Sequence, residues 1–259
     1  MSESVLQTEI KDNVAILTIN RQSEFNAFDN NTLKLFADMM ISLALNEEVK
    51  AIIITGKGKV FSGGGDLKYG VSEKGGVSSA FYNIAHFLHV AVLEIRKIPK
   101  PVIAAINGTA AGGGFSLALA CDFRIISESA KMKQAYTSNG LSIDGGGSFT
   151  LPKLVGLAKA LEITYLDEVI TAEKALEMGL VNKVVPADKL LETAIDFAKK
   201  FKNVSLNSFG ISKRLFNDSF SNSLEKQLEL EREWLAIAAA HKDGQEGVKA
   251  FLEKRKPVF

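Results

Sequence analysis

The chain has 259 residues, of which 46% are hydrophobic and 24% charged, and its formal net charge is +1. This is an ordinary globular composition, which excludes collagen-like, low-complexity and disulfide-scaffold proteins. A charge balance this close to zero gives no electrostatic footprint for nucleic acid or an anionic membrane, so we expect neither partner.

The single cysteine, Cys121, cannot form an internal disulfide, which suits a reducing compartment. No apolar run approaches the roughly 20 residues that a membrane-spanning helix needs. The first residues lack the basic-then-apolar order of a secretory signal peptide. We therefore expect a cytoplasmic protein. We expect no metal site, because the histidines show no metal-ligand spacing with carboxylates.

Strands and helices alternate along the chain up to about Val185. Short β-branched apolar runs predict strands, and apolar residues at helical spacing predict helices. The predicted strands are Val14–Asn20, Ala51–Gly56, Pro101–Ile106, Phe123–Ile126 and Val181–Val185. The predicted helices between them are Asn31–Leu45 and Ala80–Ile98. This alternation predicts βαβ units and a mainly parallel sheet.

From Ala187 onward the pattern is helical. The predicted helices are Leu190–Phe201, Ser205–Phe220, Ser223–His241 and a short one around Val248–Lys254. We therefore expect an α/β body over residues 1–186 and a helical region over residues 187–259. The helical region is expected to pack on the body or on a neighbouring copy.

Three glycine clusters mark candidate ligand-binding turns. They are Phe61–Asp66 (FSGGGD), Ala111–Phe115 (AGGGF) and Asp144–Ser148 (DGGGS), and the first two each follow a predicted strand. Glycine after a strand lets a ligand approach backbone N–H groups closely. Two such turns that face each other could present two donors to one developing oxyanion. The alternative is that these glycines serve only turns and packing.

The clusters belong to a series of motifs that resembles the crotonase, or enoyl-CoA hydratase/isomerase, superfamily. The matching segments are Asn20–Ala27, Phe61–Leu67, Lys100–Gly108, Ala111–Gly114, Ala120–Asp122, Ala172–Val181 and Glu246–Arg255. In motif the chain is most similar to Δ3,Δ2-enoyl-CoA isomerases and to the ring-epoxide isomerases of phenylacetate breakdown. The resemblance implies a spiral ββα core and a C-terminal helical region that makes homotrimers, often paired into hexamers. It also implies an acyl-CoA thioester as the ligand.

The resemblance extends to individual site residues. The oxyanion hole falls on the backbone N–H groups of Gly65 and Gly113, which would hold the thioester carbonyl as an enolate. The residues implied to contact CoA are Glu24, Ala27, Asp66, Leu67, Phe251 and Lys254. The first four would act largely through backbone, and the last two reach CoA across a subunit boundary in several relatives. Coenzyme A is then part of the substrate, and no separate cofactor is expected.

Hydratases of this superfamily add water with two glutamates, and the matching positions here are Ser116 and Tyr136. Neither side chain can act as a carboxylate base, so we do not expect hydratase activity. Asp144 matches the single catalytic acid of the isomerases. One acid suits a 1,3-proton shift from a 3-enoyl to a 2-enoyl thioester, in which it removes a proton from C2 and returns it at C4. Apolar neighbours such as Leu141 should raise the pKa of Asp144.

Other interpretations stay open. From spacing alone, Asp144 could be an N-cap or turn residue before the following helix. In the dehalogenase branch of the superfamily, an Asp at this position is a nucleophile. It pairs there with a His that matches His89 and a Trp that matches Tyr136, so we count both residues as candidates for substrate contact. The same oxyanion hole also suits thioester hydrolysis, decarboxylation or non-catalytic acyl-CoA binding. RNA binding, known in the superfamily, has no support from the net charge.

Overall fold

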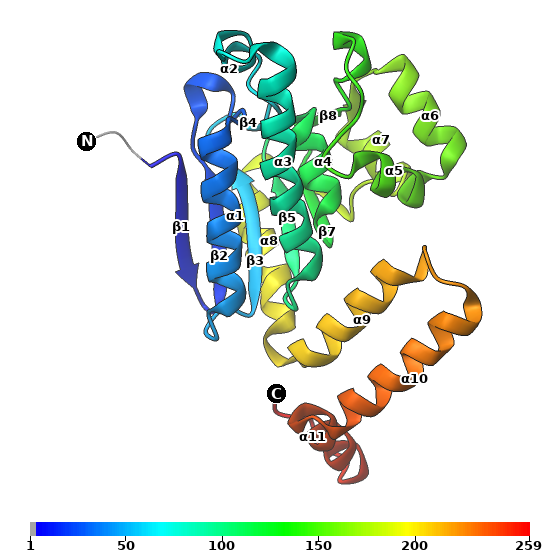
Figure 1. Cartoon of the computed structure of the whole chain (residues 1–259). Coiled ribbons are helices and arrows are strands. Elements are labelled where there is room, and N and C mark those ends of the chain that lie inside the picture. Colours follow the sequence, from blue (N-terminus) through cyan, green and yellow to red (C-terminus); the bar gives the residue numbers. More distant parts are fainter. Residues whose placement is uncertain (1–3) are drawn as a thin grey trace.

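The structure is a computed structural model that describes residues 4–259, so residues 1–3 of the predicted body lie outside the described residues. Its centre is a six-stranded sheet (Figure 1). In spatial order the strands are β1 (Leu6–Lys11), β2 (Val14–Ile19), β3 (Ala51–Gly56), β5 (Val102–Ile106), β7 (Phe123–Ser127) and β10 (Lys183–Val185). β1 pairs antiparallel with β2, and every other neighbouring pair is parallel. The predicted α/β class with a mainly parallel sheet is confirmed.

A second sheet is built from much shorter strands. Its order is β4 (Val60–Ser62), β6 (Thr109–Ala111), β8 (Lys131–Lys133) and β9 (Ile170–Thr171). β4 follows β3 along the chain, β6 follows β5, and β8 follows β7, and these three short strands pair in parallel. After each comes a helix: α2 (Leu67–Ser72), α4 (Gly113–Ala120) and α5 (Gly147–Val155). The chain therefore repeats a ββα unit, and the first two glycine clusters come at the ends of β4 and β6.

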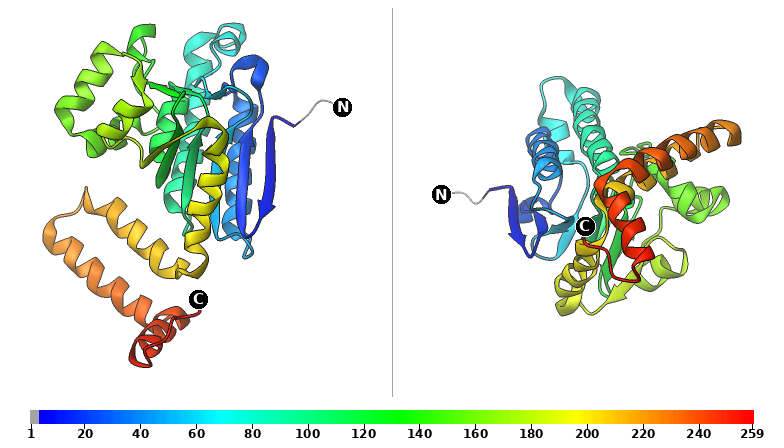
Figure 2. Two further views of the ribbon diagram at one scale, coloured as in Figure 1. Left: turned by 180° about the vertical axis from the view of Figure 1, so that it is seen from behind. Right: turned by 90° about the horizontal axis from the view of Figure 1, so that it is seen from below.

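Helices cover both faces of the large sheet (Figures 1 and 2). α1 (Asn30–Leu45) and α3 (Gly76–Lys97) lie on one face, and α8 (Leu190–Lys199) lies on the other. Each helix buries a stripe with helical spacing, because one side of it meets the sheet. On α8 this stripe is Leu190, Ala194 and Ala198, which pack with side chains of β2, β3, β5 and β7. The larger part of the core lies on the opposite face, under α1, α3 and α4.

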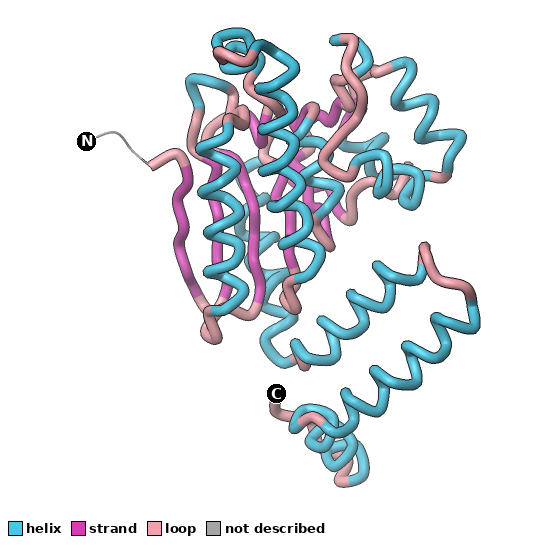
Figure 3. Tube along the Cα trace, viewed as in Figure 1, coloured by secondary structure: helices cyan, strands magenta, loops and turns pink. Residues whose placement is uncertain are grey.

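The remaining helical segments connect these layers, and Figure 3 shows how helices surround the strands. They are α6 (Leu157–Leu166), α7 (Ala172–Glu177) and the short 3-10 turns Gln22–Glu24, Thr137–Asn139, Ala187–Lys189 and Lys200–Asn203. Among the described residues, α3 is the one helix long and apolar enough to cross a membrane by length and composition alone. One face of α3, which includes Ile84, Leu88 and Ile95, is buried in the body, as in a core helix.

The last three helices form what we call the C-terminal arm: α9 (Leu206–Ser219), α10 (Leu224–Ala240) and α11 (Lys242–Leu252). The arm projects away from the sheets (Figure 1). α9 packs against α3, and a buried ion pair joins it to the body, with Lys213 Nζ 2.7 Å from Asp122 Oδ2. The boundary expected between residues 186 and 187 stays a prediction. α8, which lies just beyond it, packs on the sheet.

Candidate active site

Two glycine turns touch each other at the ends of β4 and β6, because these strands are parallel neighbours. A Cβ atom on Gly64 would lie 2.7 Å from the backbone nitrogen of Gly113. Gly64 also has a φ of +89°, so only glycine suits this position. Phe28 holds the first turn from outside: its N–H donates to Gly64 O at 2.7 Å, and its carbonyl accepts from Asp66 N at 2.9 Å.

The two predicted oxyanion donors follow directly from this contact. Gly113 is the first residue of α4, so its N–H has no partner within the helix. The N–H of Gly65 likewise makes no hydrogen bond to the described part of the chain. α4 is buried along its whole length, which fixes the Gly113 N–H in a rigid element. The sequence therefore folds into two backbone donors at one place, with no side chain needed to create them.

Asp144 lies in the loop between the 3-10 turn 137–139 and α5. Its Oδ1 accepts a hydrogen bond from the hydroxyl of Tyr136, and that hydroxyl is 3.3 Å from Oγ of Ser116. Helix α5 begins after Gly146, and no side chain caps it. The alternative that Asp144 is the N-cap of this helix is therefore wrong, because its carboxylate turns toward Tyr136 instead.

Burial raises the pKa of Asp144, as the sequence predicted. The hydrogen bond from Tyr136 and the nearby His89 each act in the opposite direction and lower it. A carboxyl group held between these influences suits proton transfer near neutral pH.

One cavity of about 220 Å³ brings the predicted catalytic groups together. Gly65, Gly113, Tyr136 and Asp144 all line it. The rest of its wall is mainly apolar: Phe28, Phe81, Ile84, Ala85, Leu88, Leu141 and Ser142. A backbone donor pair and one acid thus face the same small volume, which is the arrangement that enolate chemistry requires. The catalytic roles of these residues stay predictions.

A second cavity, of about 480 Å³, shares Gly65 with the first. Its wall includes four residues predicted to contact CoA, namely Glu24, Ala27, Asp66 and Leu67. The carboxylate of Asp66 is already used: Oδ1 accepts from Tyr69 N at 3.1 Å, and Oδ2 lies 3.1 Å from Arg21. Asp66 can therefore offer a ligand little but its backbone, as predicted.

Sequence reasoning missed Arg21, which ties the two sides of this second cavity together. Its guanidinium donates to the carbonyl of Ala27 at 2.6 Å and also pairs with Asp66 and Asp29. The signal was present, because Arg21 lies inside the matched segment Asn20–Ala27. A half-buried Arg beside two acids orders the loops from which a ligand would be bound.

The structure does not bring every predicted residue to the site. Phe251, 82% exposed, and Lys254 lie at the end of the arm and line neither cavity. His89 is on the exposed side of α3 and lines neither cavity, although its charge acts on Asp144. Between residues 4 and 259, no group of three His, Cys, Asp or Glu side chains could hold a metal ion.

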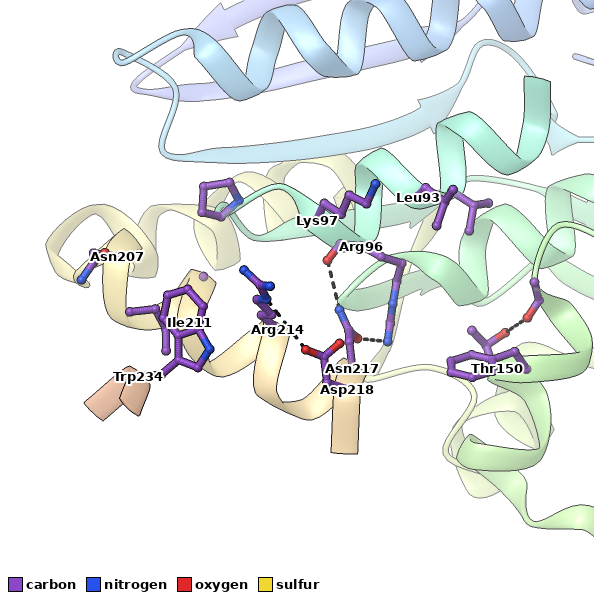
Figure 4. A pocket seen from close by; sticks show the side chains of 15 residues that line it. Leu93, Arg96, Lys97, Thr150, Asn207, Ile211, Arg214, Asn217, Asp218 and Trp234 are labelled. Carbon is purple, nitrogen blue, oxygen red and sulfur yellow. Dashed lines mark hydrogen bonds and ion pairs between the residues drawn. The ribbon is translucent and has the colours of Figure 1, made fainter. Parts of the chain in front are cut away.

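The largest cavity, about 900 Å³, lies elsewhere, between α3, α5 and helices of the arm (Figure 4). It contains none of the predicted site residues. Figure 4 shows Arg96 and Asn217 pointing toward one another and Arg214 beside Trp234, whose ring centroid is 4.8 Å from the guanidinium carbon. Size alone therefore does not mark the candidate site. The convergence of polar groups does.

Comparison with known proteins identifies the family of this chain. The sequence model described as Enoyl-CoA hydratase/isomerase matches residues 9–259. The 1,2-epoxyphenylacetyl-CoA isomerase of Escherichia coli (strain K12) is 34% identical over 260 residues, covering 100% of this chain and 99% of that protein. A trans-2-decenoyl-(acyl-carrier-protein) isomerase of Streptococcus mutans is 32% identical and covers 96% of this chain and 95% of that one.

Several other similar proteins are named hydratases. The crystal structure of an enoyl-CoA hydratase from Bacillus anthracis has a TM-score of 0.92 and 31% identity, and the match covers 99% of both chains. The chain therefore belongs to the enoyl-CoA hydratase/isomerase family, within the crotonase superfamily, and has the fold of that family.

Proposed function

We propose that the protein is an acyl-CoA isomerase that converts a 3-enoyl thioester into the conjugated 2-enoyl thioester. The observation that carries the proposal is the single carboxylate in the small cavity. Asp144 faces the same space as the N–H groups of Gly65 and Gly113. At the two positions where hydratases carry glutamates, Ser116 and Tyr136 lie within hydrogen-bond distance of each other.

The proposed reaction is a 1,3-proton shift. The thioester carbonyl accepts hydrogen bonds from Gly65 and Gly113, which stabilise negative charge on its oxygen once a proton leaves C2. Asp144 takes that proton, the electron pair spreads over a dienolate, and the same acid returns the proton at C4. Losing one such backbone donor in other enzymes costs about 2.7–4 kcal/mol of transition-state stabilisation. No net oxidation and no second substrate are involved.

The names of the relatives support a family of reactions rather than one. Two similar proteins are named isomerases, and others are named hydratases. Hydration is therefore the second candidate, since those names favour it. Adding water to a 2-enoyl thioester requires a base to activate the water and an acid to protonate carbon. This chain places only one carboxylate in the cavity wall, and this favours the isomerase.

The test uses purified protein with trans-3-hexenoyl-CoA, and ultraviolet absorbance follows the conjugated product. Asp144→Asn is expected to lower turnover by about 10²–10⁴-fold, the usual contribution of a positioned acid–base group. CoA binding, measured by calorimetry, should stay near the wild-type value. Asp188→Asn, which changes an exposed carboxylate outside both cavities, is the matched control.

A parallel assay offers trans-2-hexenoyl-CoA and measures loss of conjugation by hydration. Retained isomerisation in Asp144→Asn would contradict the proposal. Hydration faster than isomerisation in the wild-type protein would favour the second candidate instead.

We further propose that the protein is a cytoplasmic homotrimer or homohexamer. Exposed apolar side chains on the arm support this assembly: Leu224, Leu228, Leu235, Ile237, Val248, Phe251 and Leu252. Such a set of exposed apolar side chains is typical of a protein–protein contact. Assembly would also give Phe251 and Lys254 a route to a neighbour's CoA that one chain alone does not provide. Light scattering on the eluted peak of a sizing column measures the assembly state.

A further inference from the structure

Three oxygen-bearing side chains form a continuous chain of contacts beside the small cavity. Ser116 is fully buried in α4, and Tyr136 is 8% exposed. A phenol has one hydrogen to donate, and Tyr136 donates it to Oδ1 of Asp144. The contact of 3.3 Å between Ser116 Oγ and the phenol oxygen must then be a hydrogen bond that Ser116 donates. The order of donation is Ser116 to Tyr136 to Asp144.

The Tyr136 turn is held by contacts that do not involve Asp144. Oδ1 of the buried Asp167 accepts from Ala135 N at 2.6 Å, and its Oδ2 accepts from Ser138 N at 3.1 Å. Ala135 has a φ of +57°, a conformation that an alanine adopts rarely and that these bonds help to hold. The backbone N–H of Tyr136 also donates to Gln134 Oε1 at 3.0 Å. The hydroxyl is therefore already in place before any ligand binds.

We propose that Tyr136, supported by Ser116, is a positioning residue that holds Oδ1 of Asp144 so that Oδ2 is the oxygen that carries the proton between C2 and C4. This inference rests on the proposed isomerase function. A carboxylate with one oxygen tied to a donor has one orientation, and an acid that works at two carbons needs a fixed pivot. The earlier prediction made Tyr136 a substrate-contacting residue, and the geometry gives it this further task.

The same hydrogen bond has an electrostatic consequence. The influences on Asp144 are burial, which favours the neutral acid, and two groups that favour the carboxylate. These groups are Tyr136, from the turn after β8, and His89, from α3. Without the hydroxyl, only His89 opposes burial, so the pKa of Asp144 should rise.

The first test is the pH profile of kcat/KM for trans-3-hexenoyl-CoA. Tyr136→Phe keeps the buried ring and removes only the hydroxyl. The acidic limb of its profile should move to higher pH by about one to two units, the effect of losing one hydrogen bond to a charged group. Ser116→Ala should move it in the same direction by less. The matched control Tyr165→Phe, on a 77% exposed side chain, should leave the profile unchanged.

A second readout does not need turnover. Carbon NMR of protein labelled at the Asp carboxyl carbons follows the titration of Asp144, whose signal is identified by its absence in Asp144→Asn. The titration should move to higher pH in Tyr136→Phe. Thermal melting checks that the variant is folded, and if it is not, Ser116→Ala carries the same test.

The outcomes separate the two proposals. Isomerisation that survives Asp144→Asn contradicts the proposed function, whatever Tyr136 does. If Asp144 is essential but Tyr136→Phe changes neither the pH profile nor the carbon titration, the positioning role is overturned. A loss of rate that is equal at every pH, with an unchanged titration, overturns it as well, because a purely structural role would act in that way.

Discussion

The α/β body and the C-terminal arm treat their apolar side chains in opposite ways. In the body, Ile52, Ile53 and Ile54 on β3 are completely buried. On the arm, Leu235 and Phe251 are 72% and 82% exposed. Fully burying such a side chain stabilises a protein by about 1.5–3 kcal/mol. The body therefore supplies its own stability and its own site, whereas the arm leaves apolar surface for contacts outside this chain.

The largest expected effect comes from disturbing the body where the glycine turns meet. A Cβ on Gly114 would lie 2.4 Å from the carbonyl oxygen of Ser62, so β4 and α4 would have to separate. Overpacking of this kind costs about 1–3 kcal/mol. Gly114→Ala should therefore lower both the free energy of unfolding in urea and the turnover. Gly63→Ala is the control, because its nearest atom would be 3.4 Å away. Equal effects of the two variants would contradict this account.

The next effect tests the arm. Leu235→Glu changes a side chain that has little contact within its own chain, so a monomer should lose less than about 0.5 kcal/mol of stability. If another copy covers Leu235, the variant should dissociate at protein concentrations at least about tenfold higher than wild type, since 1.4 kcal/mol is a factor of ten. Light scattering across a dilution series measures this. Lys226→Gln, at an exposed position of the same helix, is the control, and an unchanged mass for Leu235→Glu would remove this residue from any interface.

A smaller effect sharpens the idea that the body spends stability on its site. Burial raises the pKa of Asp144 in the folded protein. A raised pKa stabilises the fold at low pH, and this contribution is lost as pH rises through the folded-state pKa. Asp144→Asn should therefore become more stable relative to wild type between pH 4 and pH 8. The gain in Tm should be a few degrees at most, because 1 kcal/mol moves Tm by about 2–4 °C in a chain of this size. Calorimetry that showed the opposite trend would contradict the sign.

The smallest effect concerns the end of the arm. Arg255 holds Glu246 through two bonds of 2.6 and 2.9 Å, and Glu246 also accepts from Val258 N at 3.0 Å. The Arg255 hydrogen bond lowers the pKa of Glu246 to about 2. A lowered pKa stabilises this contact above the ordinary value of 4.5, and the contribution is lost as pH falls through about 2.

Glu246→Gln should therefore speed proteolysis of residues 253–259 at neutral pH and leave global unfolding unchanged. In the wild-type protein the same release should begin only in acid. A tail that is equally protected in the variant would show that this ion pair does not hold it.

Much of the fold was predictable, because its long elements carry long patterns. β3 is a continuous apolar run, and α1 repeats apolar residues at helical spacing, so both were predicted to within one residue. β4, β6 and β8 were not predicted, because three residues are too short to show a period. β1 was also missed, because it is an edge strand in which Leu6 alone is buried.

The site was predictable where it consists of backbone or of a family motif. Gly65, Gly113 and Asp144 were found in that way, and they line one cavity. The contacts around Asp144 were not predictable, since they join Ser116 and Tyr136 through a turn that Asp167 holds from a distant loop. No local pattern records such a contact. A single chain also gives Phe251 and Lys254 no partner that would test their predicted role.

The oxyanion donors of this protein are main-chain atoms, and that has a consequence for how the family can change. Substitution can remove a side chain, but it cannot delete an N–H group except by placing proline there or by displacing the strand. The parallel pairing of β4 and β6 is therefore inherited intact, while residues 116, 136 and 144 are free to vary. New reactions can arise by exchanging a few replaceable side chains over a scaffold that already stabilises the same intermediate.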